Sequence, residues 1–533
     1  MANKLLNHQE TLVEYIPLKV SAGVLLQIGA GIYDSVAAAF KEFVSNAFDA
    51  DASAITILTD YPRFEQIKIV DDGSGMSAQR FKQAMQMIGT SLKGTIDPIR
   101  VTPKYKRPII GRLGIGLMAL SQLCNKAIIE STVKGEPSKF VAELDFSANQ
   151  SQEAAQLDVF REQYGGLENM KQILASPQTP EHLRREVQEY YDLALQANIE
   201  LLEKKLEDPE GEQLGSCVIY GNLPALADDY GTTITLTEIR PSVTDFLSAR
   251  QGLPRRRRGQ ESAQHARYLN GPLSQQVVHH LKWQEMVEKL CQPDSDLTVQ
   301  SLPPYYQFLW ELALTSPVEY LPNGPVSARA DILAHKKKEL SRFDFSLIVD
   351  NRKLIKPILL PSGGEQDDYQ IEDFTRHRVV GGERLIYQGY IYWHRKAVPV
   401  ANRGLQIYIR NVGIGIYDHR FMKFSDVNPT ANVANISGEI YIETGLERAL
   451  NLARNGFREK DEHYLALQQD VWEIVDTITK RKSQNGQVVG PNWPLAEALL
   501  IKQKLLMPVK AAVRNGSSSE DVLKLLEKLV FAL

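Results

Sequence analysis

The sequence predicts an α/β protein: a mixed α+β first domain, then a second α/β domain, then a helical C-terminal segment. Three observations support this order. Helical and strand patterns alternate up to about residue 147, strand patterns dominate again from residue 343, and helical patterns resume from residue 446. Short helices and strands that alternate in this way usually pack as layers. The 533 residues are enough for about three or four domains.

The first domain opens with a helix over residues 35–50, "SVAAAFKEFVSNAFDA", where apolar side chains recur at helical spacing. Residues 54–60 and 66–72 are short, apolar and rich in β-branched side chains, which is typical of strands. A helix over residues 116–125 and a strand over residues 126–133 follow. These elements indicate helices packed on a sheet.

A charged stretch at about residues 148–210 has no strand signal, and we expect it to form a helical insertion. Strand patterns return at 215–222 and 231–239, so the first domain is predicted to span residues 1–240. Residues 241–340 are predicted as a linker and helical region, in which residues 250–275 are polar and rich in turn-forming residues.

The second domain is predicted to span residues 341–460. It begins with an alternating strand pattern at 343–354 that contains an Asp-Asn turn, and further strands are expected at 386–395 and 405–417. Residues 446–457 are expected to be helical, as are residues 461–533.

Composition narrows the function classes. The net charge of −4 gives no global field toward nucleic acid, so such binding would need a local basic patch. The three cysteines have neither metal-ligand nor redox spacing, which fits a reducing cytoplasm. No apolar run is long enough to span a bilayer, and the first twenty residues lack a signal-peptide core. We therefore expect a cytoplasmic protein without a membrane partner.

Three polar residues share one stripe of the first helix. Glu42, Asn46 and Asp49 are four and three positions apart, so at about 100° per residue they fall within roughly 60° of one another. A solvated face or helix capping would explain them. The apolar neighbours argue against a freely solvated face, and buried carboxylates are costly unless they are paired, coordinated or functional.

Two glycine-containing stretches follow. In "IVDDGSGMS" a strand ends at Asp71, and Gly73 and Gly75 permit close approach of a ligand, although an ordinary Asp-Gly turn has the same pattern. In "GRLGIGLMAL" Gly111, Gly114 and Gly116 lead into a helix, whose N-terminal amides can bind phosphate. Each stretch alone is weak evidence.

Together, and in this order with the late strand "GTTITLTEI", these elements resemble the GHKL ATPases, which include DNA gyrase, MutL, MORC proteins, histidine kinases and ninety-kilodalton heat-shock chaperones. The resemblance implies a two-layer α/β sandwich that binds ATP and Mg²⁺. It implies Glu42 as the general base, Asn46 as the Mg²⁺ ligand and Asp49 as support for both.

The same resemblance implies that Asp71 accepts from the adenine amino group, helped through water by Thr232. Phosphate-binding amides would come from the glycine-rich turn, and a lid over ATP from residues of about 77–113. The remaining nucleotide-site residues that it implies are Gly73, Gly75, Met76, Thr90, Ser91, Lys93, Gly111, Gly114, Ile115, Gly116 and Leu117.

Residues 436–461 resemble the middle, S5-like domain of the heat-shock chaperones, which implies that Arg454 reaches the γ-phosphate as a catalytic residue. A surface or helix-end role competes with this interpretation. Arg410, on a neighbouring strand, is expected to be a surface arginine rather than a second catalytic residue. The chain departs from the chaperone pattern at Ala453 and Asn455, so a divergent prokaryotic relative is expected rather than an orthodox chaperone.

These observations leave several functions open. The leading hypothesis is a chaperone-like, ATP-driven conformational machine. In it, nucleotide would close the lid, dock the second domain and bring two chains together as a homodimer that acts on a protein client or partner subunit. The alternative is a MutL- or MORC-like clamp in defence or repair, which binds nucleic acid through Arg255–Arg258 and the basic run at 336–338. A histidine kinase is disfavoured because phosphoacceptor helices are absent upstream of residue 40, and a role without hydrolysis also stays open.

Overall fold

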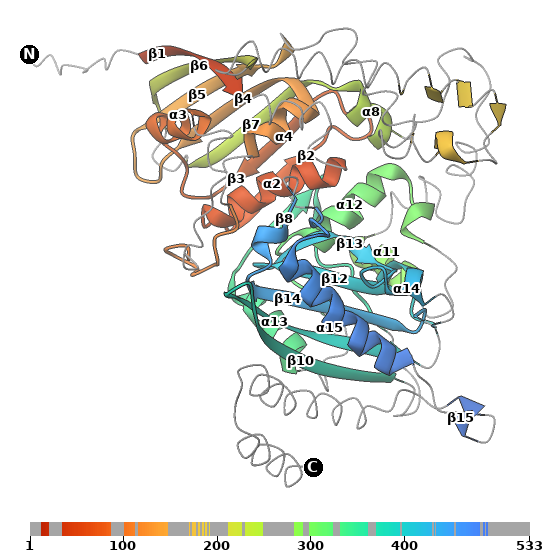
Figure 1. Cartoon of the computed structure of the whole chain (residues 1–533). Coiled ribbons are helices and arrows are strands. Elements are labelled where there is room, and N and C mark those ends of the chain that lie inside the picture. The colour runs from red at the N-terminus through yellow and green to blue at the C-terminus, as the bar shows by residue number, and fades with distance from the viewer. Residues whose placement is uncertain are drawn as a thin grey trace, which may run out of the picture.

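The computed structural model describes residues 12–20, 35–86, 101–111, 116–147, 212–225, 230–248, 282–291, 298–322, 331–360, 369–394, 397–428, 431, 433–451, 455–479, 483–484 and 487–488, with short pieces between 170 and 191. Two large sheets organise these residues (Figure 1). The first has nine strands in the order β1-β6-β5-β4-β7-β3-β2-β8-β9, and the second has five in the order β10-β11-β14-β12-β13.

The nine-stranded sheet contains seven strands from the first half of the chain and two from beyond residue 340. Neighbours pair antiparallel, except that β2 and β8 run parallel. The mixed α+β prediction for the first domain is therefore confirmed. The strands are β1 (Leu12–Val20), β2 (Ala54–Leu58), β3 (Ile67–Asp71), β4 (Cys124–Thr132), β5 (Ser138–Asp145), β6 (Glu212–Pro224), β7 (Gly231–Ile239), β8 (Ser346–Val349) and β9 (Arg352–Leu354).

Helix α2 (Val36–Asp49) lies between the nine-stranded sheet and the second half of the molecule (Figure 1). Ser35 caps its first turn by accepting the amide of Ala38 at 3.0 Å. Buried residues surround almost the whole helix, because it packs on both α4 (Gly116–Leu123) and α12 (Pro304–Thr315). A surface helix would bury a single stripe, so α2 is a core helix.

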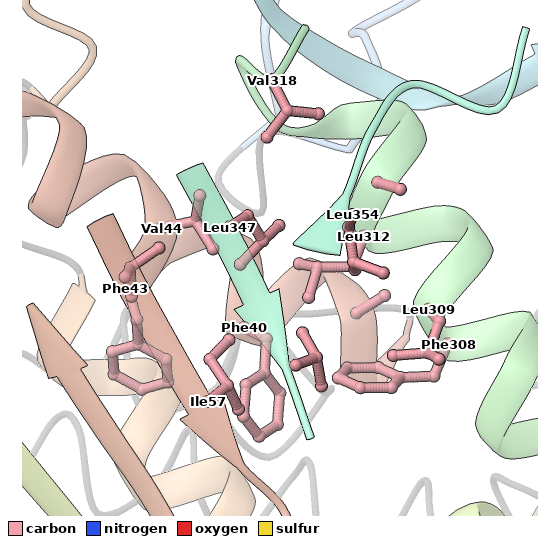
Figure 2. Packing of buried hydrophobic residues seen from close by; sticks show 14 of the residues in the cluster. Phe40, Phe43, Val44, Ile57, Phe308, Leu309, Leu312, Val318, Leu347 and Leu354 are labelled. Carbon is pink, nitrogen blue, oxygen red and sulfur yellow. The ribbon is translucent and has the colours of Figure 1, made fainter. Parts of the chain in front are cut away.

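Strands β8 and β9 come from the range predicted as a separate second domain, yet they extend the first sheet. Residues 54–57 of β2 pair with residues 346–349 of β8. Leu347 and Val349 are fully buried. They belong to one hydrophobic cluster with α2, β2 and α12 (Figure 2), whose members include Phe40, Ile57, Phe308, Leu312 and Leu354. The two halves of the chain thus share a core.

The five-stranded sheet consists of β10 (Tyr369–Val380), β11 (Glu383–His394), β12 (Gly404–Ile409), β13 (Val412–Asp418) and β14 (Ile436–Thr444). Helix α15 (Glu462–Thr479) packs on one face through a second hydrophobic cluster. Tyrosines on the opposite face join the cluster shared with α2 and α12. Helix α13 (Asp331–Arg342) also packs against β11.

A fully buried carboxylate lies on that shared face. Glu439 of β14 accepts hydrogen bonds from the hydroxyls of Tyr320, Tyr390 and Tyr441. Burial raises the pKa of Glu439 and lowers that of the neighbouring Lys356 to about 7. We call these five residues the Glu439 cluster.

Lys356 also donates to the carbonyls of Leu314 and Ser316, at 3.1 and 2.8 Å, at the end of α12. A cation is favourable at a helix C-terminus, where carbonyl groups lack intrahelical partners. The Glu439 cluster therefore fixes the end of the helix that packs on α2.

The predicted helix at residues 446–457 is wrong in the part that the structure describes. Only a 3-10 turn, η4 (Glu447–Ala449), forms, and Leu450 then bridges Phe457 as an antiparallel pair. The side-chain oxygen of Asn451 accepts from the amides of Asn455 and Gly456, at 3.2 and 3.3 Å. Such local bonds compete with helix formation.

Further helices within the described residues are α3 (Ala78–Gln86), α8 (Pro241–Leu247), α11 (Trp283–Leu290) and α14 (Phe424–Val427), with 3-10 turns η2 (Val299–Ser301) and η3 (Val400–Asn402). The described pieces between 170 and 191 are mostly helical, as predicted there. A short hairpin, β15 (Ser483–Gln484) and β16 (Gln487–Val488), follows α15. None of the helices described is both long and apolar enough to cross a bilayer.

Candidate nucleotide site

The predicted polar stripe lies on α2 and runs from the interior toward solvent. Glu42 is 8% exposed, Asp49 is half-buried and Asn46 is exposed. A carboxylate in a largely buried setting next to an accessible amide can orient a water beside a bound cation. The carboxamide oxygen of Asn46 is a ligand type that Mg²⁺ accepts.

Asp49 has a more specific role than the sequence indicated. Its two carboxylate oxygens accept from the backbone amides of Ile110 and Gly111, at 2.8 and 2.6 Å. A Cβ at Gly111 would lie 3.1 Å from the Asp49 carboxylate, so a larger residue would crowd this contact. Asp49 therefore fixes the backbone that enters the glycine-rich turn.

Residues 101–111, within the range predicted as a lid, are anchored to the C-terminal end of α2. The carboxylate of Asp51 accepts from the hydroxyl of Thr102 at 2.5 Å and from the amide of Lys104 at 2.8 Å. Together with the Asp49 contacts, these bonds hold both ends of this segment. We call residues 101–111 the anchored segment.

Arg107 lies within the anchored segment and is fully buried. Its guanidinium donates to the carbonyls of Phe48 and Ala52, at 3.1 and 2.7 Å, and to those of Phe343 and Asp344. Burial lowers its pKa. One arginine thus joins α2, the anchored segment and the chain leading into β8.

Asp71 ends β3 in a desolvated position. Burial raises the pKa of its carboxyl to about 6, although the amides of Gly73 and Thr232 donate to it and oppose this shift. Its oxygen Oδ1 lies 2.9 Å from the Gly73 amide nitrogen. Asp71 is half-buried, and a carboxylate oxygen left free by the backbone can accept from an exocyclic amine.

Ser131 completes a row of polar groups across three neighbouring strands. In register, Asp71 of β3 lies opposite Thr232 of β7, which lies opposite Ser131 of β4. The Ser131 hydroxyl lies 3.0 Å from that of Thr232 and accepts the amide of Met76 at 2.9 Å. The sequence did not single out Ser131, because only strand pairing brings it to Asp71 and Thr232.

Two glycines are required by the fold itself. Gly75 has φ +69, and a Cβ there would lie 1.8 Å from the Thr132 carbonyl oxygen. Gly231 has φ +108, and a Cβ there would lie 2.1 Å from the Asp71 carbonyl oxygen. Because any side chain would collide with backbone, these glycines let β3, β4 and β7 close around Asp71.

A cavity of about 800 Å³ adjoins this row and touches Gly75, Met76 and Ser131. It extends toward Lys82 and Glu14, which form an ion pair, but does not reach Glu42 or Asp71. Its size is in the usual range for small-molecule sites. The cavity therefore lies on the side of the site near Gly75, Met76 and Ser131, and it is separate from the polar stripe of α2.

Several predicted residues lie outside the described residues: Thr90, Ser91, Lys93, Gly114, Ile115, Arg454 and Arg255–Arg258. Gly116 and Leu117 are the first two residues of α4, so the glycine-rich turn does lead into a helix N-terminus. That is the backbone setting in which amides can bind phosphate.

Two interpretations of basic residues change. Arg410, expected on the surface, is 9% exposed and bonds to the anchored segment. Within the basic run at 336–338, Lys336 pairs with Glu339 at 2.7 Å and lies 5.2 Å over the ring of Tyr441. Lys336 is therefore committed to packing inside the protein.

Comparison with known proteins finds similarity in the first part of the chain. Residues 33–175 match the family described as histidine kinase-, DNA gyrase B-, and HSP90-like ATPase. A putative type II restriction enzyme, HgiDII of Herpetosiphon aurantiacus, is 30% identical over 128 residues, which are 23% of this chain and 19% of the relative.

DNA mismatch repair proteins MutL match as well. That of Pediococcus pentosaceus is 29% identical over 114 residues, 21% of this chain and 17% of the relative. That of Azorhizobium caulinodans is 40% identical over 77 residues, 14% of this chain and 12% of the relative. The chain thus spans less than a fifth of the length of these relatives.

The closer resemblance to the heat-shock chaperones is not confirmed, because the matched family region ends at residue 175 and the second domain lies beyond it. The matched region contains the α2 stripe, Asp71 and the glycine-rich turn, which are the elements that carried the broader resemblance. Within residues 33–175, this chain is therefore similar to the GHKL ATPases.

Proposed function

We propose that the protein binds ATP and hydrolyses it with Mg²⁺, and that it uses this cycle in a process acting on nucleic acid. One observation carries the proposal: Asp49 ties the stripe of Glu42 and Asn46 to the backbone entering the glycine-rich turn. Phosphoryl transfer depends mainly on positioning and electrostatics, and this bond would fix two walls of the proposed site relative to each other.

Adenine would lie at the Asp71 end of the site. The Asp71 carboxylate, held by the Gly73 amide, would accept from the exocyclic amine. The Thr232 hydroxyl would assist through water, and its contact with Ser131 would fix its direction. The cavity lined by Gly75, Met76 and Ser131 adjoins this end of the site, although it does not reach Asp71.

The phosphates would lie along α2. Glu42 would accept a proton from the attacking water, as a general base within the largely buried face. Asn46 would hold Mg²⁺, which supplies neutralisation of phosphate charge when bound. The amides of Gly114, Ile115 and Gly116, at the start of α4, would hold phosphate oxygens. Thr90, Ser91, Lys93 and Leu117 remain predicted contacts.

Arg454 remains a predicted catalytic residue of the second domain. The described ends of its loop give this proposal support. The Asn455 carbonyl oxygen lies 2.9 Å from the position of a Cβ at Gly415, so Asn455, the residue after Arg454, lies beside β13. Strand β13 follows the turn that contacts the anchored segment. An arginine delivered there would stabilise charge on the transferred phosphoryl group.

The names of the relatives favour the nucleic-acid alternative over a chaperone role. A mismatch repair protein and a restriction enzyme both act on DNA by name. The chaperone hypothesis required nucleotide to dock a separate middle domain, whereas here β8, β9 and α12 already share the core of α2. A homodimer, a protein partner and a cytoplasmic location remain parts of the proposal.

The test separates binding from hydrolysis. Glu42→Ala should bind ATP with near-wild-type affinity but lose at least 100-fold in turnover, the range typical of a lost general base. Glu143→Gln, an exposed change on β5, serves as the matched control and should hydrolyse normally. Unchanged turnover in Glu42→Ala would show that the general base is wrong.

A second experiment tests the nucleic-acid partner. Turnover should rise when double-stranded DNA is added at low salt, and binding should weaken steeply as salt increases. Replacement of Arg255–Arg258 by serine should reduce both effects without changing basal turnover. If neither DNA nor RNA binds or changes turnover, this part of the proposal fails, and a protein client becomes the leading hypothesis again.

A further inference from the structure

The turn between β12 and β13 has an unusual sequence for its shape. Its two residues, Arg410 and Asn411, have φ of +53 and +68. Two-residue hairpin turns of this kind favour asparagine or glycine at both positions, because few other residues tolerate positive φ. An arginine held in such a conformation is often a sign that its side chain has a role.

The Arg410 side chain leaves its own sheet and enters the first half of the molecule. It is 9% exposed, and its Nη1 donates to the carbonyl oxygen of Ile109 at 2.5 Å. Its Nη2 lies 3.6 Å from a carboxylate oxygen of Glu447, and the other oxygen of Glu447 accepts the Gly445 amide at 2.9 Å. Glu447, which belongs to the connection that follows β14, therefore holds the Arg410 guanidinium in this direction.

The bond to Ile109 acts on the peptide that Asp49 holds from the opposite side. Asp49 accepts from the amides of Ile110 and Gly111, while Arg410 donates to the carbonyl of Ile109. Three successive residues are thus fixed by one acceptor on α2 and one donor on the β12–β13 turn. These residues lead directly into the glycine-rich turn.

The same hairpin contacts α2 a second time. Lys41, which is buried beside Glu42, donates from its Nζ to the carbonyl oxygen of Gly413 at 3.1 Å. Gly413 is the second residue of β13. The β12–β13 hairpin is therefore bonded to α2 through Lys41 and to the anchored segment through Arg410.

We infer that Arg410 is a positioning residue: it fixes the backbone that enters the phosphate-binding turn and so makes nucleotide binding depend on the second domain. This inference rests on the proposed function for its effect on nucleotide. The structural part of the inference is that Asp49 and Arg410 together hold residues 109–111, an arrangement that we call the clamp. It does not depend on nucleotide and can be measured without it.

The experiment uses the full chain and hydrogen–deuterium exchange of the amides of Ile110 and Gly111. In Arg410→Gln these amides should exchange about tenfold faster without nucleotide, because the peptide loses its donor partner at Ile109. Arg410→Lys keeps one donor and should show a smaller increase. Arg403→Gln is the control: Arg403 is a partly buried arginine before β12 that donates to Val398.

Nucleotide affinity supplies the second measurement. Arg410→Gln should weaken ATP and ADP equally, by about tenfold, since a displaced turn affects phosphates common to both. Arg403→Gln should change neither affinity nor exchange. If Arg410→Gln weakened the affinity for ATP but left that for ADP unchanged, the inference would be overturned, because Arg410 would then contact the γ-phosphate itself.

Unchanged exchange at Ile110 and Gly111 in both Arg410 variants would also overturn the inference. Should Arg410→Gln lose its fold, as judged by circular dichroism, Arg410→Lys decides the result. If the wild-type chain binds no nucleotide, the proposed function fails, while the exchange measurement still tests the clamp. The two failures are therefore distinguishable.

Discussion

Asp350 and Thr59 are joined by two hydrogen bonds across 291 positions of sequence. The Asp350 carboxylate accepts the Thr59 amide at 2.7 Å and the Thr59 hydroxyl at 2.5 Å. Tyr305 of α12 donates its hydroxyl to the same carboxylate. One side chain in the β8–β9 turn thus holds the end of β2 and a helix of the second half together.

Asp350→Asn should destabilise the whole chain. The new amide group would replace an oxygen that two hydroxyls use as acceptor, which leaves buried donors unmatched and costs about 2–4 kcal/mol. Urea denaturation measures the change. The exposed Glu143→Gln should stay within about 0.5 kcal/mol of wild type. Equal midpoints for the two variants would show that this junction contributes little.

The predicted first domain should not fold well alone. A fragment of residues 1–248 lacks β8 and β9, and it leaves Phe40 and Phe48 without their ring partners Phe308, Phe343 and Phe345. The exposed apolar face of α2 should cause aggregation on size-exclusion chromatography. A fragment of residues 1–482 should elute as a defined species. A monodisperse 1–248 fragment with cooperative unfolding would contradict the shared core.

Asp71→Asn should raise stability and lower nucleotide affinity. The carboxyl pKa of about 6 exceeds the usual value near 4, so the folded protein holds this proton more tightly than the unfolded chain does. The stabilisation that the protonated carboxyl gives to the fold is therefore complete below about pH 4, and it is lost as pH rises through about 6. At pH 7.5 the free energy of unfolding of the variant should exceed that of the wild type by about 1–3 kcal/mol, and at pH 5 by about half as much.

The loss of affinity in Asp71→Asn follows from the Gly73 contact. The asparagine oxygen would keep the Gly73 amide, which places the NH₂ group toward the adenine amine, donor against donor. In the wild type, ATP affinity should fall as pH drops through about 6, because protonated Asp71 is a poorer acceptor. Thermal melts and calorimetric titrations at pH 5 and 7.5 measure both effects. A pH-independent affinity would argue against Asp71 as the adenine acceptor.

The Glu439 cluster should behave as a coupled unit. Lys356→Met leaves Glu439 as an uncompensated buried charge, and Glu439→Gln removes an acceptor used by tyrosine hydroxyls; each should cost about 3–5 kcal/mol. The double variant should cost clearly less than the sum, since it removes both charges together. Chemical denaturation of the four proteins gives this cycle. Additive losses would show that the two charges do not interact.

Local patterns in the sequence predicted the elements of the first domain well. The helix expected at 35–50 is α2 at Val36–Asp49, and the strand expected at 231–239 is β7 with the same limits. The Asp-Asn turn at Asp350 and Asn351 is also confirmed, with φ of +45 and +67. These features depend on residues near one another in sequence, where apolar period and turn chemistry act directly.

Contacts between distant segments could not be predicted. The apolar pattern of 346–349 indicates a strand but does not say which sheet it joins. Arg107 and Arg410 read as ordinary basic residues, because their acceptors are backbone carbonyls that no side-chain pattern marks. The clamp at residues 109–111 therefore became visible only in three dimensions.

The parallel pairing of β2 with β8 has a consequence during synthesis. A ribosome must add 291 residues after Thr59 before Asp350 exists, which takes about 15 to 60 seconds at roughly 5–20 residues per second. During that interval β2 has an open edge, and the apolar side of α2 lacks its cover. Nascent chains of this protein are therefore expected to need a holding factor on the translating ribosome, and slower translation of this stretch should increase that need.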